Sequence, residues 1–193
     1  YLVGAGGTAC PVYRELFNDI NPRARELQTA TLEQEYPFDW RDGDCHLWFF
    51  RDGLPGYAWY VPKQDGYVNI GLGGMSTQLK TGSQPIQAYW QKFVSYLQNR
   101  RLIDDTALDP KGHSYYLRGN VDVVRRGNAY IVGDAVGLAT RDMCEGIGPA
   151  VKSARLAARS ITGESDYALQ GLPVHSGNSI VSRWLDRKFS GAA

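Results

Sequence analysis

The chain has 193 residues with 21 basic and 20 acidic side chains, so its formal net charge is only +1. This length suits one or two domains that bury roughly 70% of the unfolded surface, and the near balance of charge gives no argument for binding nucleic acid. No apolar run approaches the roughly eighteen residues of a membrane-spanning helix, and three scattered cysteines, Cys10, Cys45 and Cys144, indicate a cytoplasmic protein rather than a disulfide framework or a metal site.

The first fourteen residues begin as a strand and carry several glycines, which suggests a dinucleotide-binding loop. The G-x-G-x-x-G fingerprint would need a third glycine where the chain has Ala9, and Pro11 and Tyr13 would lie in the helix that receives the pyrophosphate. The nearest downstream acidic residues, Glu33 and Glu35, lie in a polar stretch with no clean strand before them. These features argue against the fingerprint.

Three short aromatic strands separated by turns are predicted next, as an antiparallel meander. They cover residues 46–50, 57–61 and 67–73. The period of two puts Tyr57, Trp59 and Val61 on one face of the middle strand, and this flat aromatic face suits a long apolar ligand. Spacing alone favours the simpler interpretation, in which these rings fill the space under a helix.

A helix is predicted over residues 86–99, because apolar side chains recur there at helical spacing and Pro85 stands near its start. The apolar stripe is most simply a core face that packs on the sheet. Residues 104–127 follow as loop and edge strand, with short strands at 114–117 and 121–124.

The strongest signal is an apolar strand from Ala129 to Val132 that stops at Gly133 and Asp134. A glycine-bearing loop follows, and then an alanine-rich helix that opens near residues 145–148. The free N–H groups and the positive dipole at such a helix start favour a negatively polarised ligand. Asp134 cannot satisfy a phosphate, but its carboxylate can accept a hydrogen bond from a ribitol or ribose hydroxyl.

The tail from Asp166 contains polar turns and then a short amphipathic helix over residues 179–189. We expect this helix to pack through Ile180, Trp184 and Leu185. No segment of the chain repeats, and none is of low complexity.

The residue types that commonly carry chemistry give weak signals. His46, His113 and His175 share no spacing with each other or with a carboxylate, so neither a metal site nor a catalytic triad is predicted. Cys144 lies near the start of the alanine-rich helix, where its thiolate could be favoured, whereas Cys10 and Cys45 are expected to be small packed hydrophobes.

The stretch after the apolar strand carries a Gly-Asp-Ala-x-Gly pattern, followed by Glu-Gly-Ile. The matching residues are Gly133, Asp134, Ala135, Gly137, Glu145, Gly146 and Ile147. This pattern resembles the FAD-dependent oxidoreductases of the geranylgeranyl reductase type, a group that also includes aromatic hydroxylases and flavin halogenases. Arg141 and Asp142 lie where these relatives commonly have a proline-containing turn.

The resemblance implies that the N–H groups of Gly146 and Ile147 face the N1–C2=O edge of the flavin and stabilise negative charge on the reduced ring, while Glu145 fixes the loop. The expected cofactor-binding residues are therefore Gly133, Asp134, Gly137, Glu145, Gly146, Ile147, Gly148 and Arg14.

The start of the chain is similar to a second, internal motif of this group, Val-Gly-Ala-Asp-Gly-x-x-Ser-x-x-Arg. The residues that fit are Val3, Gly4, Ala5 and Gly7, with Gly6 in place of the aspartate, Cys10 in place of the serine, Tyr13 at the arginine position and Arg14 one residue late. The resemblance implies that the N-terminal nucleotide-binding half lies outside this chain, which is then a C-terminal fragment.

Between these two motifs the middle strand and the next one resemble the Tyr-x-Trp-x-Phe-Pro…Gly-x-Gly pattern of the isoprenoid cavity. The expected substrate-binding residues are Tyr57, Trp59, Pro62, Gly71 and Gly73, with Val61 in place of the phenylalanine. Halogenases have Trp-x-Trp-x-Ile-Pro here, so Tyr57 brings the chain nearer to the reductases.

We expect an α+β fold, with a mostly antiparallel substrate-domain sheet flanked by partial pieces of an FAD-binding domain. The expected domain limits are 1–15 and 126–163 for the FAD-binding pieces, 16–125 for the substrate domain and 164–193 for the tail.

The implied activity is reduction of carbon–carbon double bonds in a prenyl substrate, with FAD as cofactor and NAD(P)H or another electron donor. An FAD-dependent aromatic monooxygenase and a non-catalytic binding or folding module remain open, as do self-association and a peripheral membrane contact.

Overall fold

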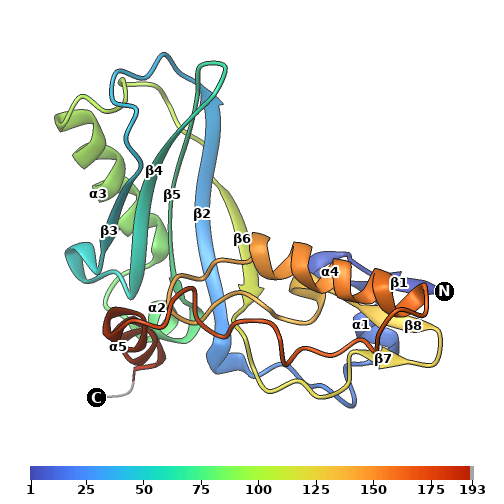
Figure 1. Ribbon diagram of the computed structural model, residues 1–193. Coiled ribbons are helices and arrows are strands. Elements are labelled where there is room, and N and C mark those ends of the chain that lie inside the picture. Colours follow the sequence, from blue (N-terminus) through green and yellow to red (C-terminus); the bar gives the residue numbers. More distant parts are fainter. Residues whose placement is uncertain (192–193) are drawn as a thin grey trace. The chain divides into compact units, whose positions relative to one another are not determined.

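The computed structural model describes residues 1–191, and these separate into two compact units (Figure 1). Unit 1 consists of Tyr1–Gln28 together with the chain from Tyr115 onward, and unit 2 is Thr29–Ser114. Residues 16–28 and 115–125, placed in the middle domain by the sequence analysis, pack within unit 1. Phe17 and Val124 explain this placement, because both side chains are buried in the core of that unit.

Unit 2 is built on a five-stranded sheet with the strand order β3-β4-β5-β2-β6. The strands are β2 (Gln28–Pro37), β3 (His46–Phe49), β4 (Gly56–Lys63), β5 (Tyr67–Met75) and β6 (Lys111–Tyr116). The pairs β3–β4, β4–β5 and β2–β5 are antiparallel, so the predicted meander and the predicted α+β class with a mostly antiparallel sheet are both confirmed. The segment 121–124, predicted as an edge strand, contains no strand.

The expectation that no clean strand precedes Glu33 and Glu35 is wrong, because they belong to β2, the longest strand of the sheet. Thr31 and Leu32 of this strand are buried and pair with Gly73 and Leu72 of β5. Both glutamates therefore lie on a strand that its pairing with β5 holds in the sheet. The strand was not predicted because its composition is polar. Threonine favours a strand through its β-branched side chain, but it does not add to an apolar pattern in the sequence.

Helix α3 (Ile86–Asn99) begins and ends where the sequence predicts, and its apolar stripe packs on one face of the sheet (Figure 1). The buried members of the stripe are Tyr89, Trp90, Phe93 and Leu97. Phe93 meets the ring of Trp48 edge-on, with a centroid distance of 5.5 Å. A short helix that the sequence did not predict, α2 (Ser76–Thr81), follows β5 directly.

Unit 1 contains a three-stranded sheet with the order β1-β8-β7. Its elements are β1 (Leu2–Gly4), α1 (Pro11–Leu16), β7 (Arg125–Arg126), β8 (Ala129–Ile131), α4 (Ile147–Ile161) and α5 (Ile180–Ser190). Strand β1 runs parallel to β8, which in turn pairs antiparallel with β7. The core of the unit includes the fully buried side chains of Phe17, Tyr130 and Ile131.

Pro11 and Tyr13, which were expected to be unsuited to a helix, lie in α1. Pro11 occupies the first position of this helix, where its missing N–H costs no hydrogen bond and its fixed φ suits the helical backbone. Short 3-10 turns connect the other elements: η1 (Gly7–Ala9), η2 (Arg25–Leu27), η3 (Arg51–Gly53) and η4 (Gly133–Ala135).

The C-terminal helix α5 starts at the predicted place, with the hydroxyl of Ser179 accepting a hydrogen bond from the Ser182 backbone N–H at 3.1 Å. Its packing face was predicted wrongly. Leu185 is buried as expected, but Ile180 is 84% and Trp184 44% exposed. The buried face is turned around the helix axis so that Phe189 packs instead. No helix among the described residues has the length and apolar character needed to cross a bilayer.

Candidate functional site

The two glycine-bearing segments of unit 1 lie side by side. Strand β1 pairs with β8 so that Val3 stands opposite Tyr130, and the Val132 N–H donates to the Gly4 carbonyl at 3.0 Å. The chain continues from Gly4 into η1 and from Val132 into η4. Two stretches that are more than a hundred residues apart in sequence are thus brought together at one end of a parallel strand pair, the end at which open α/β sheets commonly bind ligands.

The glycines of the Gly-Asp-Ala-x-Gly segment are required by the backbone. Gly133 and Gly137 have φ angles of +58° and +83°, which L side chains rarely adopt. A β-carbon at Gly133 would also lie 3.0 Å from the Cβ of Ala150 in α4. The Gly133 N–H donates to the Ser153 hydroxyl of the same helix at 3.0 Å. Strand β8, the turn and α4 therefore pack so closely that a side chain at Gly133 would force a neighbour to shift.

The carboxylate of Asp134 faces the start of α4. A β-carbon at Gly146 would stand 3.3 Å from Asp134 Oδ1, so the absence of a side chain at Gly146 leaves the carboxylate room for a partner. Burial raises the pKa of Asp134, and the nearby guanidinium of Arg23 opposes this shift. A partly buried carboxylate of this kind is suited to accept a hydrogen bond from a ligand hydroxyl.

Arg23 ties the two segments together, and the sequence analysis did not identify it. Its Nη1 donates to the Thr8 carbonyl at 2.6 Å, and its Nη2 donates to the Ala135 carbonyl at 2.8 Å. The guanidinium carbon also lies 3.7 Å from the ring centroid of Tyr13. A single arginine outside both motifs carries no recognisable signal, so only the folded chain reveals this role.

Glu145 caps the start of α4. Its Oε1 accepts a hydrogen bond from the Gly148 N–H at 2.6 Å, and its own N–H donates to the Thr140 hydroxyl at 3.1 Å. These bonds fix the loop that leads into the helix. Ile147 is 81% exposed, so its side chain leaves the helix start accessible.

Arg14 lies apart from this arrangement, and the thiol of Cys144 differs from what the sequence suggested. The side chain of Arg14 is 69% exposed and pairs with Glu15 at 2.9 Å, so the structure does not bring it together with Asp134. Burial, and to a lesser degree Asp142, raises the pKa of the Cys144 thiol to about 12. The raised pKa favours the thiol over the thiolate that the helix start could have stabilised, because burial outweighs the effect of the helix start.

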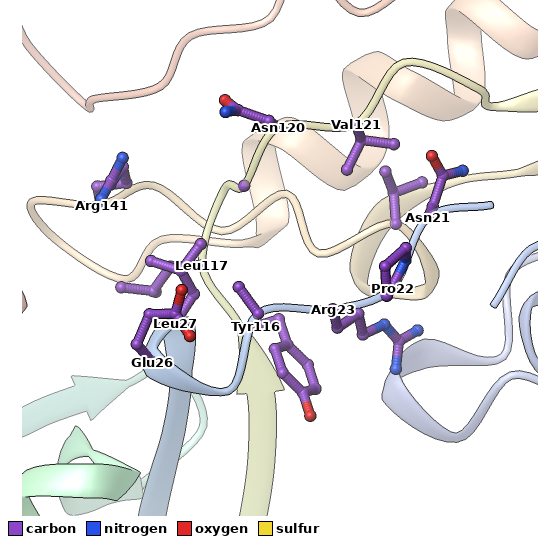
Figure 2. A pocket seen from close by; sticks show the side chains of 13 residues that line it. Asn21, Pro22, Arg23, Glu26, Leu27, Tyr116, Leu117, Asn120, Val121 and Arg141 are labelled. Carbon is purple, nitrogen blue, oxygen red and sulfur yellow. The ribbon is translucent and has the colours of Figure 1, made fainter. Parts of the chain in front are cut away.

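A cavity of about 310 Å³ lies beside the Gly-Asp segment in unit 1 (Figure 2). Its lining comes from residues 21–24, 26–27, 116–117 and 119–121, with Val136 and Arg141 from the chain that follows η4. None of the residues proposed from the sequence lines it. Val136 and Arg23 connect it to the Gly-Asp segment, since both are adjacent to or in contact with Ala135.

In unit 2 the aromatic face of β4 is half-buried and lies opposite the core. The rings of Tyr57 and Trp59 are 5.8 Å apart, and Phe49 of β3 extends the row at 5.3 Å from Tyr57. Alternation puts Pro62 on the other face, with the buried Ala58 and Tyr60. The rings are therefore not sealed in the core, although Pro62 does not join them.

Two glycines of β5, Gly71 and Gly73, make room on this same face. A β-carbon at Gly71 would stand 2.2 Å from Cζ2 of Trp59, so the indole ring lies directly over the backbone of Gly71. The indole Nε1 donates to Asn69 Oδ1 at 2.7 Å, which fixes the ring orientation. At Gly73 a β-carbon would stand 2.6 Å from Cγ2 of Thr31. Both glycines are thus buried beneath neighbouring side chains, and the accessible part of this face consists of the half-buried aromatic rings.

Each histidine has a carboxylate partner in the structure, although no sequence spacing indicated one. The Nε2 atoms of His46 and His175 lie 2.8 Å from Asp42 and Asp186, and His113 Nε2 lies 3.4 Å from Glu33. Of these pairs, that of His113 and Glu33 is brought together across a long sequence separation, by folding alone. Within residues 1–191 no three His, Cys, Asp or Glu side chains form a group that could hold a metal ion.

Comparison with known proteins connects this geometry to a family. Residues 28–106 match the family model described as geranylgeranyl reductase catalytic domain. Menaquinone reductase from Mycolicibacterium smegmatis is 32% identical over 127 residues, which are 60% of this chain and 29% of that protein. The chain therefore spans less than a third of the length of this relative.

Solved structures share the fold. A geranylgeranyl bacteriochlorophyll reductase-like protein from Thermoplasma acidophilum superposes with a TM-score of 0.58 at 18% identity, covering 85% of this chain and 39% of that one. A probable FAD-dependent monooxygenase from Pseudomonas aeruginosa gives a TM-score of 0.59 at 18% identity, covering 98% and 58%. The resemblance to the FAD-dependent oxidoreductases of the geranylgeranyl reductase type is therefore confirmed, with residues 28–106 matching the catalytic domain of that family.

Proposed function

We propose that this chain is the part of an FAD-dependent oxidoreductase that holds the flavin ring end and binds an isoprenoid substrate, whose carbon–carbon double bonds are reduced. The observation that carries this proposal is the contact between the segment after β1 and η4, with the Asp134 carboxylate against Gly146. The matched catalytic-domain family and the FAD-dependent neighbours support the cofactor.

The residues at this corner fit a flavin. Gly146 lacks the β-carbon that would crowd Asp134, and Asp134 is a partly buried acceptor for a ribityl hydroxyl. Glu145 caps α4 and orients the N–H groups of Gly146 and Ile147, which would stabilise negative charge on a reduced ring. A bound flavin would supply hydride chemistry that no side chain of this protein can provide.

The aromatic face of unit 2 would hold the substrate. Tyr57 and Trp59 present half-buried rings, with Trp59 seated over the buried backbone of Gly71, and an unbranched or methyl-branched apolar chain can lie along these rings. The name of the relative from Mycolicibacterium smegmatis, menaquinone reductase, supports a prenyl-bearing substrate. Burial of the chain against these rings would orient a double bond and exclude water.

The experiment is to titrate the protein with FAD and then supply a prenyl substrate without oxygen. We expect the flavin absorbance band to shift on binding, and the product to gain two hydrogen atoms by mass spectrometry when NAD(P)H or dithionite donates electrons. FAD uptake without product would leave the non-catalytic module as the better description. Absence of FAD uptake by the protein that contains this chain would contradict the proposal.

A second candidate is an FAD-dependent aromatic monooxygenase. The similarity of fold to a probable FAD-dependent monooxygenase, which covers 98% of this chain, favours it. The same assay in air separates the two, because a monooxygenase consumes oxygen and its product gains one oxygen atom. Oxygen-dependent product formation, with no anaerobic reduction of the prenyl chain, would favour this candidate.

The location and assembly of the protein complete the proposal. The three cysteines are free, which supports a cytoplasmic location. Self-association and a peripheral membrane contact are tested by size-exclusion chromatography and by sedimentation with lipid vesicles. A single monomeric species that stays in the supernatant would exclude both.

A further inference from the structure

The loop between η4 and α4 is attached to the C-terminal segment, residues 174–190. The Arg141 N–H donates to the Val174 carbonyl at 2.9 Å. The Ser176 N–H donates to Asp142 Oδ1 at 2.8 Å. Backbone and side-chain bonds thus fasten the loop to a part of the chain that begins some thirty residues later.

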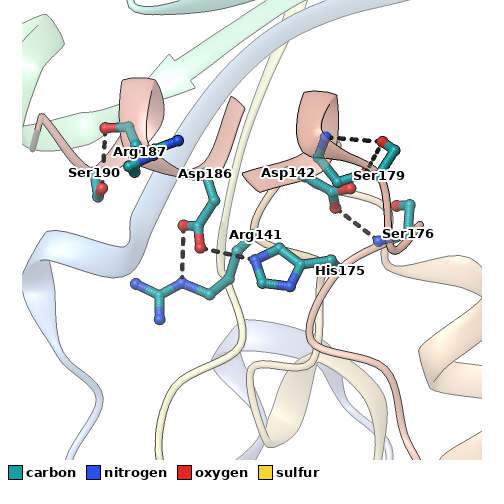
Figure 3. A network of polar contacts seen from close by, with 9 residues as sticks. Arg141, Asp142, His175, Ser176, Ser179, Asp186, Arg187 and Ser190 are labelled. Atoms are coloured by element: carbon teal, nitrogen blue, oxygen red, sulfur yellow. Dashed lines mark hydrogen bonds and ion pairs between the residues drawn. The ribbon is translucent and has the colours of Figure 1, made fainter. Parts of the chain in front are cut away.

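Asp186 of α5 contacts Arg141 from the loop and His175 from the tail (Figure 3). One carboxylate oxygen lies 3.2 Å from Arg141 Nε, and the other lies 2.8 Å from His175 Nε2. The Asp186 side chain is only 22% exposed, so these interactions are less screened by water than those of a surface ion pair. The carboxylate links the loop, the tail and the helix in one network.

Asp142 is a buried carboxylate that depends on the C-terminal segment. Burial would raise its pKa, but hydrogen bonds from the Ser176 N–H and from the Ser182 and Ser176 hydroxyls outweigh burial and lower it. Asp142 is only 1% exposed. The Ser176 N–H is therefore a donor that the C-terminal segment supplies to a buried carboxylate, and losing this hydrogen bond while the carboxylate stays buried would cost free energy.

The constraint extends to the start of α4. Thr140, whose hydroxyl lies 2.9 Å from that of Ser176, accepts a hydrogen bond from the Glu145 N–H and donates its own N–H to the Glu145 carbonyl. Glu145 in turn caps Gly148. Residues 140–148 contain no proline, so their conformation depends on such tertiary bonds rather than on a stiff backbone.

We propose that the C-terminal segment is a clamp that holds residues 140–146 in the conformation that presents the N–H groups at the start of α4 to the flavin. Asp186 and Asp142 are positioning residues in this arrangement. The inference rests on the proposed function, because those N–H groups are the ones assigned to the flavin ring.

The first test is hydrogen–deuterium exchange of residues 140–148 in the flavin-free protein. Asp186→Ala is expected to speed exchange of this loop by about tenfold, because it removes the partner of both Arg141 and His175. Asp166→Ala is the matched control, since Asp166 is an exposed carboxylate outside the network. Equal exchange in Asp186→Ala and the control would overturn the proposal.

A double-mutant cycle distinguishes the loss of one shared contact from a general destabilisation of the protein. Arg141→Met keeps most of the side-chain length but removes the charge, and it is expected to speed loop exchange as Asp186→Ala does. If the two residues act through one clamp, the double variant should be little worse than either single variant. Additive effects would contradict the shared network.

The second readout is the flavin itself. Asp186→Ala is expected to weaken FAD affinity by about fivefold and to change the shape of the visible flavin band, while Asp166→Ala changes neither. Faster loop exchange with unchanged FAD affinity and spectrum would overturn the positioning role. If the wild-type protein takes up no FAD, the proposed function fails, and the exchange experiment still decides whether the clamp exists.

Discussion

Arg23 and Ala135, which are 112 positions apart in sequence, are joined by a hydrogen bond of 2.8 Å from Nη2 to the carbonyl oxygen. The same guanidinium donates to the Thr8 carbonyl at 2.6 Å. Burial lowers the pKa of Arg23, so this is a partly desolvated cation whose carbonyl partners offset the loss of water. The fork geometry of one guanidinium fixes the spacing between the segment after β1 and η4.

Arg23→Lys is therefore expected to destabilise the fold by about 2 kcal/mol, because a single ammonium group cannot hold both carbonyls in the same geometry. The urea midpoint of unfolding measures this effect. Arg25→Lys is the control, since Arg25 is exposed in the neighbouring turn η2. Equal midpoints for the two variants would contradict the bridging role of Arg23.

Gly133→Ala is expected to cost about 2 kcal/mol, since a β-carbon would have to accept both a left-handed backbone and an approach of 3.0 Å to Ala150. Gly127→Ala separates these two causes. Gly127 has a similar φ of +57° but open space around it, so its cost of about 1 kcal/mol should report backbone strain alone. Thermal unfolding of both variants checks the difference, and a larger loss in Gly127→Ala would refute the close approach of η4 and α4.

The indole of Trp59 and the backbone of Gly71 form a single unit of the proposed substrate surface. Gly71→Ala must displace the ring, because the added carbon would stand 2.2 Å from Cζ2. We expect a loss of about 2 kcal/mol in stability, a shifted tryptophan emission spectrum and weaker binding of a prenyl ligand. Gly112→Ala in β6 is the control, where the added carbon finds an ordinary contact of 3.8 Å. Prenyl affinity that is the same in both variants would remove Trp59 from the substrate surface.

What the sequence predicts depends on how local the signal is. Helix α3 and the meander were predictable because their apolar side chains repeat at 3.6 or two residues within each element. Strand β2 was missed because its buried side chains include Thr29 and Thr31, which do not add to an apolar pattern. Its place in the sheet is set by its partner β5 rather than by its own composition.

The candidate site divides in the same way. The turn at Gly133 was predictable because a Gly-Asp pair after an apolar strand is a local turn signal, and Gly133 does have a positive φ. Arg23 and the pair formed by His175 and Asp186 could not be found, since their partners lie in segments that meet only after folding. The exposure of Ile180 could not be predicted either, because the helical period alone does not decide which of two neighbouring faces of α5 is buried.

Two aspartates of unit 1 should respond to pH in opposite directions. Burial raises the pKa of Asp134 against the opposing effect of Arg23, so the folded state favours its protonated form. Stability from this group is present below the unfolded value near 3.8 and is lost as the pH rises through the folded pKa. Asp134→Asn is therefore expected to stabilise the protein at pH 7 and to change little at pH 3, while weakening FAD binding.

Asp142 has a lowered pKa, because hydrogen bonds from Ser176 and Ser182 outweigh the effect of burial. Its contribution is present above pH 4 and is lost as the pH falls through the folded pKa, so Asp142→Asn should destabilise the protein most at pH 7. Urea unfolding at pH 3 and pH 7 measures both variants. If both substitutions stabilise the protein at pH 7, or both destabilise it, one of the two stated pKa directions is wrong.

Cys144 should be less reactive than Cys45, which reverses the order suggested by the sequence, because Cys45 is exposed rather than packed. Burial raises the pKa of its thiol to about 12, whereas Cys45 is exposed in the loop before β3. Because the thiolate is the nucleophile, iodoacetamide at pH 8 should label Cys45 well before Cys144 in the folded protein. Peptide mass spectrometry follows both sites, and labelling in urea is the control that both thiols can react. Rapid labelling of Cys144 would mean that the loop after η4 opens readily, which would also argue against the clamp formed by the C-terminal segment.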